Sequence, residues 1–377
     1  MKKFFVFLLI LWVFFSFFSI NQKNYTFIKK VQAHLVEHPE KLPQAEFAKF
    51  SSIGFYNLAA DIYWLQTIQY IGWNAVKSEY KKYLYEMMHL ITELNPYFES
   101  PYVLGQLLIP WGNDMYEDFT QEEQEEHKMK GEKLGLKWIR NFCNSEAIEK
   151  IKNEDDLQKI ISDEIYKNPC KSYKIPYYLA YIYFYYLKDN LTASQYYKIV
   201  SAQEDAPPWA RVLAAIMQGK WGERKKSIFM FLSLAQNTPV KDESCMILTS
   251  KIEDTYQMMT QSWLPVTGEL IKNIEFARNA ILPPFSSENE NTLLGDTECS
   301  NFLIKAIREL SILYLEEADI SFQKDFPEEV SAKTPEKLFE LWYIDFIPTD
   351  YQRYNENEGM IYRYNEDIGR FDYKMEY

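Results

Sequence analysis

Four cysteines are the side chains of this chain best suited to covalent or metal chemistry: Cys143, Cys170, Cys245 and Cys299. None belongs to a C-x-x-C pair and no histidine follows at a zinc-binding spacing, so we expect no metal site. In an exported chain an even number of cysteines favours two disulfides. Sequence order favours Cys143–Cys170 and Cys245–Cys299, while the other pairings and four buried free thiols stay open.

Motifs that would indicate an enzyme are missing from the sequence. There is no G-x-x-x-x-G-K-[ST], G-x-G-x-x-G, G-x-S-x-G or H-E-x-x-H. The 54 acidic residues offer too many pairs for a glycosidase-type pair to be singled out. We therefore expect a non-catalytic protein without a cofactor, and the net charge of −13 disfavours nucleic acid as a partner.

The amino-terminal end carries a long apolar segment. Lys2 and Lys3 precede an unbroken apolar run over residues 4–20, about 25 Å of helix at ~1.5 Å per residue. This length is short for a bilayer but within the spanning range, and no small-residue cleavage site follows it. We predict an uncleaved single-pass signal anchor over residues 1–22 in the cytoplasmic membrane, with the main domain extracytoplasmic; a removed signal peptide is the alternative.

The remaining chain has the spacing of packed helices. After a juxtamembrane linker over residues 23–50, one apolar stripe contains Leu58, Ile62, Leu65, Gln69 and Gly72. A second stripe on the same helix predicts that it packs between neighbours. Further helices are predicted at 79–94, 101–108, 130–141, 176–187, 192–202, 209–217, 223–235, 245–262, 267–281 and 299–318.

Paired antiparallel helices that repeat every ~34–40 residues indicate an all-α helical solenoid. We assign it to residues 51–322, with a charged insertion at 143–172 whose base a disulfide could close. Strand signals occur only near the carboxyl terminus, so residues 323–377 are predicted to form a helix and a small β-hairpin.

The helix pairs resemble tetratricopeptide repeats (TPR). In the best unit, Leu179-Ala180 stand at the Leu-Gly pair of the first helix and Tyr183 at its later aromatic position. Ala193 matches the small residue of the second helix, Tyr197 the aromatic that follows, and Pro207 the closing proline. The resemblance implies a scaffold whose groove, lined by the first helix of each pair, binds other proteins.

Longer segments resemble membrane-anchored repeat proteins of bacterial envelopes. The segments at 52–70, 187–189 and 206–209 look like their signatures, and residues 334–350 resemble an element shared with type II secretion pseudopilins. Tyr351 replaces the second proline of that element and no glycine follows at 352–354, so its calcium-loop role is not carried over. Residues 360–364 and 369–374 are expected to form the hairpin that follows.

The acid Asp61 stands in an otherwise apolar helix, where burial is costly unless the carboxylate is paired. It either braces a neighbouring helix or loop, or lies in the groove and anchors a peptide amide or amine with Asn57 and Trp64. Carried over from the repeat resemblance, the further groove positions are Lys174, Tyr177, Tyr181, Phe184 and Tyr185. These aromatics either anchor a partner or pack the helix pair.

The sequence therefore predicts a membrane-anchored scaffold. Its expected partners are protein components of the envelope, of a secretion system or of a pilus, with a peptide or helix of the partner bound in a concave groove. The sequence leaves the oligomeric state open. The alternative function is that of an exported α-helical glycan-binding protein or carbohydrate-active enzyme, with the aromatics as sugar platforms.

Overall fold

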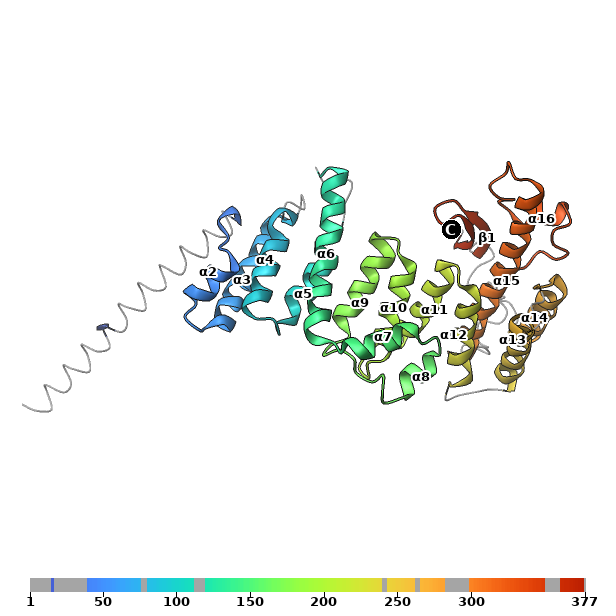
Figure 1. The fold of residues 1–377 in the computed structure, drawn as a ribbon, viewed down its shortest axis with the longest axis horizontal. Coiled ribbons are helices and arrows are strands. Elements are labelled where there is room, and N and C mark those ends of the chain that lie inside the picture. The colour runs from blue at the N-terminus through green and yellow to red at the C-terminus, as the bar shows by residue number, and fades with distance from the viewer. Residues whose placement is uncertain are drawn as a thin grey trace, which may run out of the picture. The chain divides into compact units, whose positions relative to one another are not determined.

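The computed structural model describes residues 15–16, 39–75, 80–111, 119–238, 243–261, 265–281, 298–349 and 360–375. These residues are mostly helical, with two strands near the carboxyl terminus, which confirms the all-α class (Figure 1). The chain divides into two compact units, residues 1–141 and 142–377. The range 51–322, predicted as a single solenoid, is thus divided between two units because contacts between segments far apart in sequence concentrate within each unit.

The first unit contains one short 3₁₀ turn and five α-helices among its described residues. They are η1 (Pro39–Lys41), α2 (Ala45–Ser51), α3 (Tyr56–Trp73), α4 (Lys81–Leu94), α5 (Glu99–Leu108) and α6 (Gln121–Phe142). Helix α4 packs on α2, α3 and α5. Ala48 of α2 lies in a core with Ala60, Leu90 and Ile91. The range predicted as a linker up to residue 50 therefore includes a folded helix, because α2 buries an apolar residue there.

One face of α3 differs from its prediction. The stripe expected to pack against a neighbour is exposed along its whole length, from Leu58 through Ile62 and Leu65 to Gly72. The buried residues of α3 are Ala60, Gln66, Thr67 and Tyr70. Apolar periodicity identifies the faces of a helix, but it does not say which face the rest of the chain covers.

Helix α6 begins nine residues before its predicted start at 130. The Thr120 hydroxyl accepts a hydrogen bond from the Glu123 backbone N–H (3.3 Å), and the Glu123 carboxylate accepts one from the Thr120 backbone N–H (2.8 Å). This reciprocal pair is a capping box, which satisfies two of the N–H groups that the first helical turn leaves unpaired. The acidic segment before 130 is therefore partly helical.

The second unit contains the remaining elements. They are α7 (Ser145–Asn153), α8 (Leu157–Ser162), α9 (Lys174–Tyr181), the π-helical turn η2 (Ile182–Tyr186), α10 (Asn190–Ser201), α11 (Trp209–Trp221), α12 (Arg224–Gln236), α13 (Glu243–Gln261), α14 (Gly268–Ile281), α15 (Glu298–Asp325), α16 (Pro335–Glu340), β1 (Met360–Asn365) and β2 (Arg370–Met375). Helices α9 to α14 each pack against the next helix along the chain (Figure 1). Helix α15 then packs on α12, α13 and α14.

The segment predicted as an insertion is part of this core. A disulfide joins Cys143 to Cys170 at its base, and the two residues also form an antiparallel bridge. Its helices α7 and α8 pack on α10, and α8 also packs on α12. Ile151 and Leu157 are fully buried. A second disulfide joins Cys245 of α13 to Cys299 of α15, so the structure holds both pairings that sequence order favours.

Strands β1 and β2 form an antiparallel hairpin near the predicted ranges, with Asn365 opposite Arg370 at its turn. Strand β2 packs on α15. Gly369 in the turn has a φ of 67°, a conformation that glycine adopts without strain.

The predicted membrane anchor lies almost wholly outside the described residues. Except for Phe15 and Ser16, residues 1–22 lie outside the described part of the chain. Among the residues that are described, no helix combines the length and the apolar character needed to cross a bilayer.

Candidate protein-binding surface and buried charge cluster

The face of α9 and η2 carries a row of tyrosines. Tyr177, Tyr181 and Tyr185 follow one another at a spacing of four residues along this segment. The rings of Tyr181 and Tyr185 are stacked, with centroids 5.3 Å apart, and the Tyr177 ring lies edge-on to Tyr197 at 5.7 Å. Tyr177 and Tyr181 are half-buried, whereas Tyr185 is 50% exposed. The row thus has a packed base and an open end.

A tryptophan from the next helix pair extends this row. The indole N–H of Trp209, at the start of α11, donates a 3.4 Å hydrogen bond to the Tyr177 hydroxyl, and the Trp209 side chain is 57% exposed. We call Tyr177, Tyr181, Tyr185 and Trp209 the aromatic face. Large aromatic side chains with a polar end and few rotatable bonds are the commonest anchors of protein interfaces.

The local sequence explains how the row is presented. Helix α9 passes into a π turn at Ile182–Tyr186, closed by a hydrogen bond from the Leu187 N–H to the Ile182 carbonyl (3.0 Å). Asp189 then caps α10 by accepting from the Thr192 N–H at 3.0 Å. The π turn ends the helical segment that begins with α9, as such turns commonly do, and it carries Tyr185 near that end.

Burial raises the pKa of Tyr181 and of Tyr197 above the ordinary value for tyrosine. Both hydroxyls therefore stay protonated at neutral pH and remain able to donate hydrogen bonds. Two lysines border the aromatic face: Lys174 is exposed at the start of α9, and the Lys188 ammonium lies 5.3 Å from the centre of the Tyr185 ring.

The predicted groove position Phe184 lies elsewhere. It lines a separate cavity of about 470 Å³ together with Lys220 and Asp372 and with residues of the hairpin turn. The π turn explains the difference, since the added residue changes the direction of the side chains that follow it. Trp209 was missed as a site residue, although the Ala206-Pro207-Pro208-Trp209 segment that carries it is distinctive.

The second predicted set lies in the first unit and is described separately. Asn57 and Asp61 are exposed on α3. Trp64 instead packs edge-on against Phe98 at 5.5 Å, beside the core around Ala60. Asp61 forms no hydrogen bond with another described residue, so it braces none of them, and its place in a binding groove stays a prediction.

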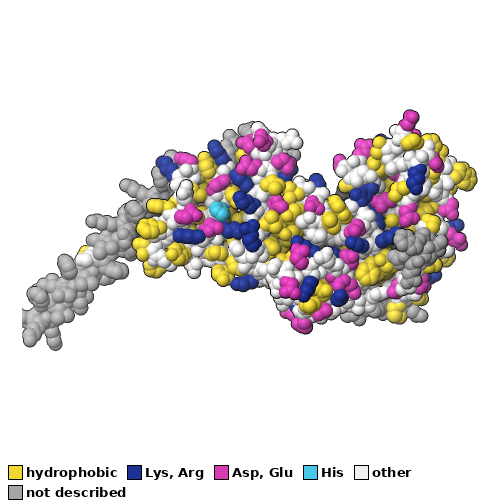
Figure 2. Space-filling model, viewed as in Figure 1, with side chains coloured by type: hydrophobic (Ala, Val, Ile, Leu, Met, Phe, Trp, Pro, Cys, Tyr) yellow, Lys and Arg dark blue, Asp and Glu magenta, His cyan; other side chains and the backbone are white. Residues whose placement is uncertain are grey.

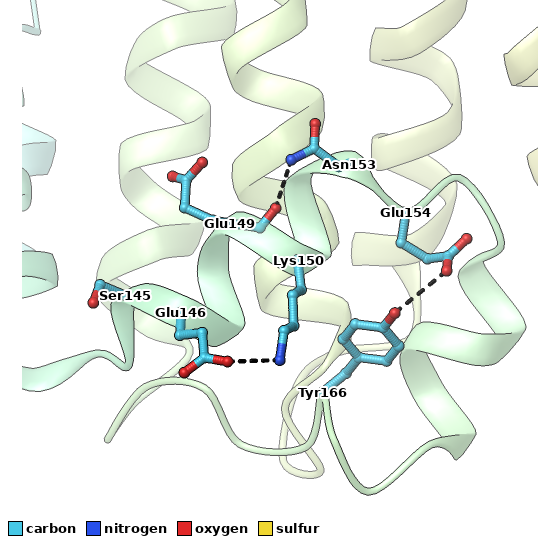
Figure 3. A pocket seen from close by; sticks show the side chains of 7 residues that line it. All are labelled: Ser145, Glu146, Glu149, Lys150, Asn153, Glu154 and Tyr166. Atoms are coloured by element: carbon cyan, nitrogen blue, oxygen red, sulfur yellow. Dashed lines mark hydrogen bonds and ion pairs between the residues drawn. The ribbon is translucent and has the colours of Figure 1, made fainter.

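A shallow pocket of about 700 Å³ lies over α7 (Figure 3). Lys150 donates to Glu146 at 2.7 Å, and the Tyr166 hydroxyl donates to Glu154 at 3.3 Å. The i,i+4 pair of Lys150 and Glu146 is typical of a solvated helix surface. Among the described residues, no three His, Cys, Asp or Glu side chains are grouped to bind a metal.

A buried charge cluster, which the sequence analysis did not predict, lies between α12, α15 and β2. Arg224 is almost fully buried and donates to Glu309 (2.9 Å), to Glu316 (3.4 Å) and to the Phe371 carbonyl (2.9 Å). Asp372 lies 3.6 Å from Arg224 and accepts from Lys220 at 2.9 Å. This buried charge cluster (Arg224, Glu309, Glu316, Asp372, Lys220) joins the hairpin to three helices, α11, α12 and α15.

The cluster holds more carboxylates than its buried arginine can neutralise. Burial opposes the charge on Arg224, but Glu309, Glu316 and Asp372 outweigh this effect and raise its pKa. Burial raises the pKa of Glu309 against the influence of Arg224. Burial likewise raises the pKa of Glu316 to about 7, although Arg224 and Arg370 oppose this shift. Glu316 therefore titrates near neutral pH.

This titration predicts how stability depends on pH. The folded chain holds the Glu316 proton more tightly than the unfolded chain, whose pKa is near 4.5. Between these two pKa values the unfolded chain binds fewer protons, so stability falls as the pH rises from about 4.5 to about 7. We expect Glu316→Gln to reduce this pH-dependent loss of unfolding free energy by up to about 3 kcal/mol. Urea unfolding at acidic and at mildly alkaline pH measures the difference. Equal pH slopes for the variant and the wild type would contradict it.

Comparison with known proteins finds no family model, no curated protein and no solved structure that matches the chain. What is established is a mostly helical protein with two compact units.

Proposed function

We propose that this protein is a non-catalytic, membrane-anchored scaffold of the cell envelope with a TPR-like helical solenoid. The aromatic face is the observation that carries the proposal, because it combines exposed aromatic rings with a base rigidly packed in the second unit. The consecutive packing of α9 to α14 is compatible with a solenoid. The partner would be a component of the envelope, of a secretion system or of a pilus. One of its peptides or helices would bind to this face.

The proposed binding mode depends on pre-organisation. Tyr181 stacks on Tyr185 and lies edge-on to Tyr186, with ring centroids 5.9 Å apart, so little side-chain freedom is left to lose on binding. Ordering of flexible side chains is one of the main costs of association. The stacked rings also engage each other face to face, which leaves less flat surface for a sugar ring than the glycan-binding alternative requires.

Truncation of the open end of the row tests the proposal. We expect Tyr185→Ala together with Trp209→Ala to weaken partner binding at least about tenfold, because such anchors contribute most of the energy of an interface. The measurement is quantitative co-purification with the tagged full-length chain from detergent-solubilised membranes. Phe276→Ala is the matched control, since Phe276 on α14 is also aromatic and 77% exposed.

The double variant must lose partner binding without losing folding stability. Both substituted residues are largely exposed, so we expect the melting temperature to change little. Partner recovery equal to that of Phe276→Ala would contradict the assignment of the aromatic face. Turnover of a glycan without any co-purifying protein would instead support the alternative function.

A further inference from the structure

An exposed apolar surface covers part of the first unit. Phe50, at the end of α2, is 83% exposed, and Ile53 and Phe55, in the turn to α3, are 84% and 69% exposed. Leu58, Ile62 and Leu65 continue the surface along α3. We call these six residues the apolar ridge. Hydrophobic side chains reach the surface over α2 and α3 (Figure 2).

The turn displays its apolar side chains at a conformational cost. Ile53 has a φ of 48°, and the following Gly54 has a φ of 86°. A β-branched residue is rarely found in this region, because its side chain crowds the backbone there. No described atom lies within 4 Å of where a Cβ of Gly54 would be. The turn therefore leaves open space around Gly54, and the neighbouring Ile53 side chain is itself largely exposed.

The sequence indicates what could cover the ridge. The apolar run over residues 4–20 and the first described helical turn at Pro39 are separated by residues 21–38. Eighteen residues span at most about 60 Å when fully extended. If the run anchors the chain, as the proposed function holds, the ridge is tethered within reach of a lipid surface.

The composition of the ridge favours lipid over a partner helix. The stripe Leu58, Ile62 and Leu65 has the three-and-four spacing of a helix-pairing seam. However, a seam needs only the stripe, whereas here the exposed apolar surface extends onto a projecting turn with Phe50, Ile53 and Phe55. Phenylalanine, leucine and isoleucine side chains enter the boundary between lipid headgroups and acyl chains.

We propose that the apolar ridge inserts into the interface of the membrane in which residues 4–20 are anchored. The inference rests on the proposed anchor. Insertion would hold the first unit against the bilayer instead of leaving it on a free tether. The ridge itself carries no lysine or arginine, and the exposed acid Asp61 lies next to Ile62 on α3. Insertion should therefore not depend on anionic lipid, and the Asp61 carboxylate would have to stay at the level of the headgroups.

A fluorescent probe on the full-length chain tests the insertion. All four native cysteines are in disulfides, so Ile53→Cys provides one thiol for an NBD label. The labelled chain is reconstituted in phosphatidylcholine vesicles whose acyl chains carry a nitroxide quencher. We expect blue-shifted emission and strong quenching at position 53. The same label at Lys150→Cys, on the exposed surface of α7 in the second unit, should remain unquenched.

A second variant and an extraction step separate the outcomes. Phe50→Ser and Phe55→Ser added to Ile53→Cys should abolish the quenching while the chain still resists carbonate extraction. If the chain stays in the vesicles after carbonate treatment but the probe at position 53 remains in water, the insertion is overturned and the anchor is not. Blue-shifted emission without nitroxide quenching overturns it in favour of a protein contact. A chain that carbonate removes overturns both the anchor and the insertion.

Discussion

Arg224→Ala is expected to lower the free energy of unfolding by about 3–5 kcal/mol at neutral pH. The substitution leaves Glu309 almost fully buried without its 2.9 Å partner, and it removes the donor to the Phe371 carbonyl. An isolated buried carboxylate is costly, and the chain can avoid this only by protonating it or by opening the site. Urea unfolding followed by circular dichroism measures the loss.

The neighbouring Lys225→Ala is the matched control, because Lys225 is an exposed residue of the same helix. Its effect should stay within about 0.5 kcal/mol. Arg224→Met combined with Glu309→Gln should recover part of the loss, since the buried charge is removed together with its partner. A fully stable Arg224→Ala variant would show that the cluster does not join the hairpin to α12 and α15.

Replacing Cys245 and Cys299 with alanine is expected to destabilise the chain by about 4 kcal/mol. The disulfide closes a loop with a sequence separation of 54 residues and joins α13 to α15. Without the cross-link the unfolded chain gains the conformational entropy that loop closure had removed. Thermal or urea unfolding of the oxidised protein and of the double variant measures the difference.

The disulfide that closes the shorter loop provides a comparison for the size of this effect. Cys143 and Cys170 are separated by 27 residues, so their removal should cost slightly less, about 3.5 kcal/mol. Reduction of the native protein should reproduce both losses together. Peptide mapping without reductant should recover Cys245 linked to Cys299. Alkylation of both thiols in the native protein would contradict this pairing.

Local signals predicted most of the helices. The predicted range 79–94 became α4 (Lys81–Leu94), and the range 267–281 became α14 (Gly268–Ile281). Helix α4 ends at Leu94, the predicted last residue, because Asn95 precedes Pro96 and the residue before a proline is disfavoured in a helix. The early start of α6 was also readable, since Thr120 and Glu123 have the spacing of a capping box.

Features that depend on distant residues could not be predicted. Arg224 lies 85 residues from Glu309 and 92 from Glu316, so no local spacing connects them. The exposed side of α3 was assigned to a buried interface, because its apolar spacing is the same whether another helix or a membrane covers it. Phe184 was assigned to the groove through the resemblance to tetratricopeptide repeats, whose helices do not include a π turn like the one at Ile182–Tyr186.

The aromatic face is the centre of the proposed function, and site-specific photocrosslinking in intact membranes tests it most directly. A photoreactive phenylalanine analogue replaces Tyr185 in the tagged full-length chain, and Phe276 carries the same analogue in the control. The account predicts a short, reproducible set of envelope proteins crosslinked from position 185 and absent from position 276. The same adducts from both positions, or no protein adduct from position 185, would contradict it.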